Sequence, residues 1–206
     1  MQSRCSYKSW QLDVAPLLCA DACRVFFEEN AGGSSLISEC MSMEVLAMAF
    51  GARLLKTEMQ LTYFPFNSAM TDFSVLLDGV ELGVSVTRAI GHPASPFTFE
   101  DATRLLRKKL SGVIKSTAAI ANADWRKQIL HVWARTALVA RVVEEAYAML
   151  EPEVIADTLV IVTHCTLPEL FTEKATARPT RQSRKLKGLK GEEHEAILRE
   201  SDPTRR

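Results

Sequence analysis

Two segments of this sequence concentrate cationic side chains that could bind phosphate. Arg104 and Lys108 are four residues apart in a stretch with helical periodicity, so they share one helix face. The segment 178–190 holds six basic residues and no acid, and Lys and Arg neutralise the phosphates of nucleic-acid backbones. A solvated helix face and a solubilising tail are the alternative interpretations. The candidate nucleic-acid-binding residues are Arg104, Lys108, Arg184, Lys185 and Lys187.

The charge balance and the cysteines indicate the class of protein. Basic and acidic residues number 25 each over 206 residues, so the basic segment leaves the rest slightly acidic. Residues 174–206 supply little apolar surface, which predicts a disordered basic tail on a single α/β domain of residues 1–173. Five cysteines, an odd number, indicate reduced thiols and a cytoplasmic or nuclear protein. No apolar run reaches the ~20 residues of a membrane span, so no membrane partner is expected.

Most motifs of nucleophilic, nucleotide and metal chemistry are missing from the sequence. It contains no Walker A loop, no Gly-x-Gly-x-x-Gly after a strand, no Gly-x-Ser-x-Gly elbow and no His-Glu-x-x-His. Cys19 and Cys23 have no second Cys/His pair at matching spacing, so we expect structural thiols rather than a zinc site. His131 lies in an apolar stretch, where a core or edge histidine is expected rather than a general base.

Apolar periodicity predicts alternating helices and strands. The expected helices cover 14–29, 34–54, 98–119 and 136–150, and the expected strands cover 59–64, 72–77, 81–89, 127–134 and 158–162. Asp78-Gly79 indicates a hairpin turn, and Thr98 with Asp101 indicates a capping box. Helix–strand alternation in the second half requires parallel crossovers. We therefore predict a mixed central sheet flanked by helices, with the apolar strand 158–162 buried on both faces.

The second expected helix opens with Gly33-Ser34-Ser35 and has Gly51 near its end. These residues, followed by three strands, a helix and a strand, resemble the PD-(D/E)xK nuclease superfamily. The resemblance covers roughly residues 33–163. It implies a restriction-endonuclease-like core of order α-β-β-β-α-β, here with an extra N-terminal helix.

The resemblance also implies a metal-dependent active site. In this family carboxylates hold Mg²⁺, a hard cation that prefers oxygen ligands, and the metal activates water for attack at phosphate. Asp72 stands where the family's second strand begins with an aspartate, and Glu39 matches the glutamate of the first core helix. Glu44 is the alternative to Glu39. Asp72 and Glu39 are thus the implied metal ligands.

The third expected strand departs from the family pattern. An acid and a lysine two residues apart belong there on one strand face, but Ser85 and Thr87 occupy their positions. Lys108 or Lys109 on the following helix could replace the lysine, whereas Glu81 lies about 13 Å from Ser85 at ~3.3 Å per residue. The implied catalytic set is Asp72, Glu39, Glu44, Ser85, Thr87 and Lys108.

Three functions follow from these observations. The first is a nuclease-like domain that associates with nucleic acid and has a weak or inactive catalytic centre. The second is a protein-interaction module with a protein partner or a second copy of the chain, and no role with nucleic acid. The third is an active Mg²⁺-dependent nuclease. A cofactor is expected only in the third case.

Removal of residues 174–206 is expected to leave the melting temperature unchanged, because this segment offers few apolar atoms to bury. Scanning calorimetry of the full and shortened chains measures this. A drop of several degrees in the shortened chain would show that the segment is part of the fold.

Overall fold

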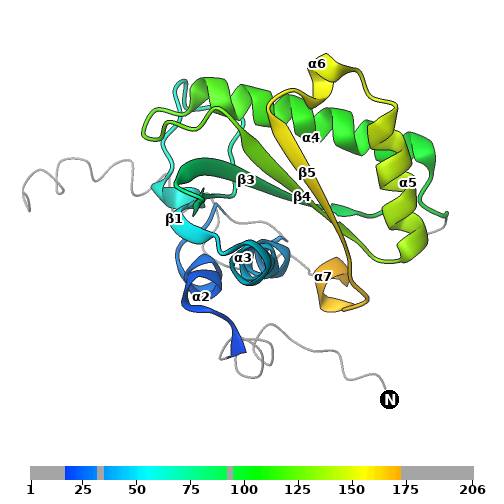
Figure 1. Cartoon of the computed structure of the whole chain (residues 1–206), viewed down its shortest axis with the longest axis horizontal. Helices are drawn as coiled ribbons and strands as arrows, with labels where there is room; N and C mark the ends of the chain where they lie inside the picture. Colours follow the sequence, from blue (N-terminus) through cyan, green and yellow to red (C-terminus); the bar gives the residue numbers. More distant parts are fainter. Residues whose placement is uncertain (1–16, 32–34, 92–94, 173–206) are drawn as a thin grey trace, which may run out of the picture.

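Residues 17–31, 35–91 and 95–172 are described by the computed structural model of the protein. They form a five-stranded sheet with helices against both of its faces (Figure 1). The tail of residues 174–206, with Arg184, Lys185 and Lys187, lies outside this part of the chain. Its disorder and its phosphate binding therefore stay predictions.

The sheet is mixed, as the sequence predicts. Its strands follow chain order: β1 (Arg53–Thr57), β2 (Phe73–Leu77), β3 (Val80–Ala89), β4 (Gln128–Ala134) and β5 (Thr158–His164). β2 pairs antiparallel with β1 and with β3, and β4 pairs parallel with β3 and with β5. Asp78 and Gly79 form the β2–β3 turn at φ values of 48° and 79°, the positive values that a tight hairpin requires.

One face of the sheet is covered by α4 (Phe99–Ala119) and α5 (Ala137–Ala148) (Figure 1). α4 begins at the predicted capping box, in which the Thr98 hydroxyl accepts from the Asp101 N–H and Asp101 accepts from the Thr98 N–H. The buried residues beneath these helices are Ala102, Leu106, Leu110, Leu130, Val132, Val143 and Ala146. α6 (Pro152–Ile155) connects α5 to β5.

The opposite face is covered by α2 (Ala20–Phe27), α3 (Leu36–Phe50) and α7 (Glu169–Thr172). α3 ends at Gly51, whose φ of 69° is the left-handed value favoured by a C-terminal glycine. Trp133 fixes α3 to the sheet, because its indole N–H is 3.1 Å from the Ser38 carbonyl and 2.9 Å from the Ser42 hydroxyl.

Three sequence predictions about the elements are wrong. The expected strand at 59–64 is a 3₁₀ turn, Glu58–Gln60, and a single bridge from Tyr63 to Ile120. The first strand is instead β1, because α3 ends at Phe50 and the Leu54 N–H is bound by the Asp21 carboxylate at 2.8 Å. β5 is not buried on both faces. It is an edge strand, and Leu159 is 58% exposed.

The remaining helices and strands agree with the sequence to within a few residues, although the expected first helix begins beyond the described part, at residue 14. In the part that is described, no helix is long and apolar enough to cross a membrane. The cysteines within that part, Cys19, Cys23, Cys40 and Cys165, are free thiols.

Gly83→Ala should destabilise the protein by roughly 1–3 kcal/mol through overpacking. A Cβ at this position would lie 2.9 Å from Trp125 Cε2 and 3.0 Å from the Gln128 side chain, and both side chains are buried. Urea unfolding followed by circular dichroism measures the change. Gly112→Ala is the matched control, because its Cβ would meet nothing within 4 Å. It should stabilise α4 by about 0.5–1 kcal/mol. Equal effects of the two substitutions would contradict this account.

Candidate functional site

β2 and β3 separate at Val86, and side chains complete the hydrogen bonds of the backbone there. β2 pairs no further than Phe73, opposite Val84, while β3 continues to Ala89. The Val86 N–H donates to Asp72 Oδ2 at 2.6 Å. The Val86 carbonyl accepts from Lys109 Nζ at 3.3 Å. An acid that precedes β2 and a lysine from α4 therefore meet at one residue of β3.

The Asp72 carboxyl is surrounded by protein atoms, although the residue as a whole stays partly accessible. Burial raises its pKa, while the Lys109 ammonium and the Val86 N–H act in the opposite direction. Both opposing groups belong to this chain. The carboxyl is thus held in place by internal partners.

The structure brings Lys109, not Lys108, to Asp72. Lys109 is partly buried under the sheet-facing side of α4, whereas Lys108 is exposed. Within the described residues Lys108 makes no ion pair, so the choice of Lys108 as the displaced lysine is corrected. The two residues are adjacent in sequence, and only the orientation of α4 distinguishes them, because neighbouring helical residues point about 100° apart.

Ser85 and Thr87 lie on the α4 side of the sheet, the same side as Asp72. They are level with Leu130 and Val132 of β4, which belong to the core beneath α4 and α5. The alternation of side chains along a strand places Asp72 on this side too, because Phe73 faces α3. Ser85 is buried and Thr87 is half-buried. Both are neutral hydroxyls beside the Asp72–Lys109 pair.

Glu39 and Glu44 do not join this site, because α3 packs against the opposite face of the sheet. Glu39 accepts a hydrogen bond from the Ser35 hydroxyl. Glu44 Oε2 accepts from the Cys19 N–H at 2.8 Å and so connects α3 to α2. The implied pairing of Asp72 with Glu39 as metal ligands is therefore not formed. No group of three His, Cys, Asp or Glu side chains that could hold a metal occurs in the ranges described above.

Glu81 is another acid on this side of β3, and it is engaged by neighbours in the sheet. Its Oε1 accepts from Lys56 Nζ at 3.3 Å and from the Ser74 hydroxyl at 3.1 Å. Lys56 lies on β1 and Ser74 on β2, so this trio spans three strands. The charge of Glu81 is compensated by Lys56 within the sheet.

A buried polar network that sequence reasoning missed lies next to Asp72. The Thr71 hydroxyl contacts both Gln128 Oε1 and the Ser116 hydroxyl at 3.1 Å. Gln128 Nε2 donates to the Ser116 hydroxyl at 2.7 Å. The Thr71 N–H donates to the Tyr63 hydroxyl at 2.9 Å, and burial raises the pKa of Tyr63. The only sequence signal was Gln128, a polar residue at the start of an apolar strand.

His131 lies on the other face of the sheet, in the core. Its Nε2 is 2.7 Å from the Thr163 hydroxyl, and its ring packs on Trp133 with the centroids 4.6 Å apart. Burial lowers the pKa of His131 to about 4. The expectation of a core histidine is confirmed.

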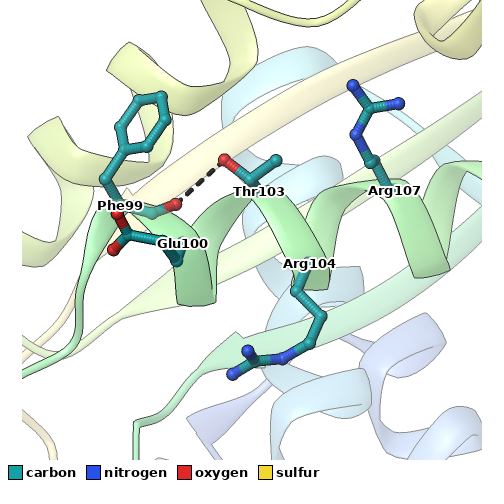
Figure 2. Close-up of a pocket in the computed structure, with 5 residues that line it drawn as sticks. All are labelled: Phe99, Glu100, Thr103, Arg104 and Arg107. Atoms are coloured by element: carbon teal, nitrogen blue, oxygen red, sulfur yellow. Dashed lines mark hydrogen bonds between the residues drawn. The ribbon is translucent and has the colours of Figure 1, made fainter.

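A hollow of about 510 Å³ lies along the first half of α4, lined by Phe99, Glu100, Thr103, Arg104 and Arg107 (Figure 2). Its two arginines point to different sides of the helix (Figure 2). Arg107 is 2.7 Å from Glu151 Oε2, and Arg104 is paired with Asp101. Arg104, a predicted phosphate ligand, is therefore already compensated by an acid.

No family model matches the chain. The chain is 43% identical over 155 residues to the AAC-rich mRNA clone AAC4 protein of Dictyostelium discoideum, a match that covers 72% of this chain but only 23% of that protein. The structure of Pyrococcus furiosus SfsA in complex with Ca²⁺ matches 67% of this chain and 62% of its own, with 11% identity and a TM-score of 0.28. The fold assignment rests on the strand order and directions given above.

The Asp72→Asn variant should become more stable relative to the native protein as the pH rises from about 4 to about 8. Because the pKa of Asp72 is raised in the folded state, the stability that this group contributes is present below its unfolded pKa. It is lost as the pH rises through the folded pKa. Asparagine does not titrate. Urea unfolding at stepped pH measures the difference.

Lys109→Met is the companion variant. Removal of the ammonium should raise the pKa of Asp72 further and extend the loss of stability to higher pH. If the free energies of unfolding of the native protein and of Asp72→Asn change in parallel at every pH, folding does not shift the pKa of Asp72.

Proposed function

We propose that the protein is a nuclease-like domain of the PD-(D/E)xK type that associates with nucleic acid and does not cleave it. The observation that carries the proposal is the Asp72–Val86–Lys109 arrangement. It puts an acid and a lysine where β2 and β3 separate, the place that the sequence resemblance assigns to catalysis. A cytoplasmic or nuclear location belongs to the same proposal.

The residues around Asp72 do not fit a Mg²⁺ ion. A hard dication needs several oxygen ligands, among them more than one carboxylate or phosphate. Asp72 is bound to Val86 and faces Lys109, while Ser85 and Thr87 offer neutral hydroxyls. Glu81 is occupied by Lys56. An acid is therefore missing where the family requires one, even though Lys109 replaces the lysine.

The loss of one charge-stabilising group at a reacting centre typically costs about 3–4 kcal/mol. That corresponds to a rate roughly 10²–10³-fold slower. Burial of the Asp72 carboxyl and compensation of its charge by Lys109 each make it a poorer ligand for a dication. These magnitudes support a domain that keeps the shape of a nuclease without its turnover.

Support for association with nucleic acid comes from lysines on the outer surface of α4. Lys108 and Lys115 are both exposed, and seven residues separate them, so they lie on one side of the helix. The basic segment 178–190 adds six positive charges with no acid. A protein-interaction module would not need these cations, since lysine is depleted in protein interfaces.

The full chain should bind a fluorescent 20-nucleotide DNA or RNA strand in a salt-sensitive manner, and should cleave none with Mg²⁺ or Mn²⁺. Lys108→Ala with Lys115→Ala should lower the slope of log affinity against log salt by roughly 1.5. Fluorescence anisotropy between about 50 and 200 mM salt measures the slope. The matched control, Arg135→Ala with Arg141→Ala, removes two exposed charges elsewhere and should leave it unchanged.

Two outcomes would contradict the proposal. Cleavage abolished by Asp72→Asn would show an active nuclease. Absence of binding even at low salt would favour the protein-interaction module.

A further inference from the structure

Two phenylalanine rings project from the loop between β1 and β2. Phe64 is 73% exposed and Phe66 is 85% exposed. Their ring centroids are 6.5 Å apart, and the ring planes are inclined by 74°. Scattered single apolar residues on a surface are ordinary, but two adjacent rings at these exposures form a local aromatic surface.

The backbone that carries these rings is fixed at several points. The Phe64 N–H donates to the Ala119 carbonyl of α4 at 2.8 Å, and the Ser68 N–H donates to the Pro65 carbonyl at 3.0 Å. Tyr63 is buried, and its hydroxyl accepts from Thr71. The rings are therefore exposed on an anchored loop. Binding of a ligand would cost little free energy for ordering this loop.

Lysines lie along α4 on the side where this loop is attached. Lys108, Gly112, Lys115 and Ala119 follow at steps of four, three and four residues, so they form one strip about 16 Å long at 1.5 Å per residue. The strip ends at Ala119, the residue bound by Phe64. A Cβ at Gly112 would meet nothing within 4 Å, so the space between the lysines is open.

No acid of the loop itself offsets the charge of these lysines. Lys108 and Lys115 make no ion pair with any residue that the structure describes. The loop segment 59–71 contains no acidic residue. A polyanion could therefore approach the lysines and the rings without repulsion from the loop itself.

We propose that this surface binds single-stranded nucleic acid, with Lys108 and Lys115 on its phosphates and Phe64 and Phe66 stacked on its bases. The inference rests on the proposed function and adds the class of nucleic acid and the residues that select it. Aromatic rings beside a cationic track are the usual means of binding an unpaired strand, since every base presents a flat face.

The ring geometry favours an unpaired strand over a duplex. Bases in a duplex lie parallel and are covered on both faces by their neighbours, so two rings inclined by 74° cannot both stack on them. An unpaired strand can turn successive bases toward each ring. The neighbouring lysines favour a nucleic acid over a protein, because protein interfaces are enriched in aromatic residues but depleted in lysine.

The test compares three labelled ligands of 20 nucleotides: a single strand, a blunt duplex of the same sequence, and a single strand whose central nucleotides lack bases. Fluorescence anisotropy with the full chain should show tighter binding of the intact single strand than of the duplex. Phe64→Ala with Phe66→Ala should weaken binding of the intact single strand by roughly 30-fold or more and leave binding of the duplex unchanged. The strand without bases should bind the native protein and this variant equally.

Conservative variants separate stacking from mere burial of apolar surface. Phe64→Tyr with Phe66→Tyr keeps the flat faces and should retain the affinity. Phe64→Leu with Phe66→Leu keeps apolar surface but has no flat face, and this variant should lose affinity for the single strand. The exposure of both rings predicts an unchanged melting temperature for each variant, measured alongside.

The outcomes distinguish the two proposals. Equal binding of single strand and duplex, unaffected by loss of the rings, would overturn the stacking inference and leave nucleic-acid association standing. No binding of any of the three ligands at low salt would overturn the proposed function and this inference with it. Full affinity of the leucine variant would show that the rings do not stack on bases.

Discussion

The backbone of Val86 lies just beyond the last β2–β3 pair and needs other hydrogen-bond partners, and much of the arrangement around α4 follows from how they are supplied. A buried N–H or carbonyl without a partner is costly. Asp72 accepts from the N–H and Lys109 donates to the carbonyl, so both side chains are positioned by one strand residue. The same contacts join the start of β2, the middle of β3 and the sheet-facing side of α4. The network of Thr71, Ser116 and Gln128 extends this attachment toward the end of the helix.

Such a structural role conflicts with metal chemistry at the same carboxyl. A carboxylate that binds a dication must offer its oxygens to the ion, whereas one Asp72 oxygen already accepts from Val86 and a lysine compensates its charge. Compensated carboxyls recur at Glu81 with Lys56 and at Glu151 with Arg107. In the described part of the chain these acids are paired with cations of the protein itself. Among the same described residues, the exposed Lys108 and Lys115 of α4 have no acidic partner.

The helices, the hairpin and the parallel half of the sheet could be predicted because they depend on local signals. Thr98 with Asp101 and Asp78-Gly79 each act within four residues. The strand at 53–57 was missed because its partners are distant in sequence: it pairs with β2, and its Leu54 N–H donates to the Asp21 carboxylate. Asp72 was identified from a resemblance, but the choice between Lys108 and Lys109 stayed open, since helical spacing alone does not fix which of them faces the sheet. The predicted pairing of Glu39 with Asp72 failed for a similar reason. The sequence places a glutamate on a helix, whereas packing decides which face of the sheet that helix covers.

The division of the molecule into two faces has a consequence for function. α3 carries the glutamates on one side of the sheet, and α4 carries the lysines on the other. Because the sheet lies between them, the acids of α3 cannot act on a ligand held by α4, nor repel it at short range. The α4 side has the cations, the open space at Gly112 and the anchored rings of Phe64 and Phe66. Asp72 and Glu81 lie on this side too, but the first accepts from the Val86 N–H and the second is paired with Lys56. Under the proposed function, the choice of sheet face for α3 is thus one physical reason for binding without cleavage, because it withholds Glu39 and Glu44 from Asp72.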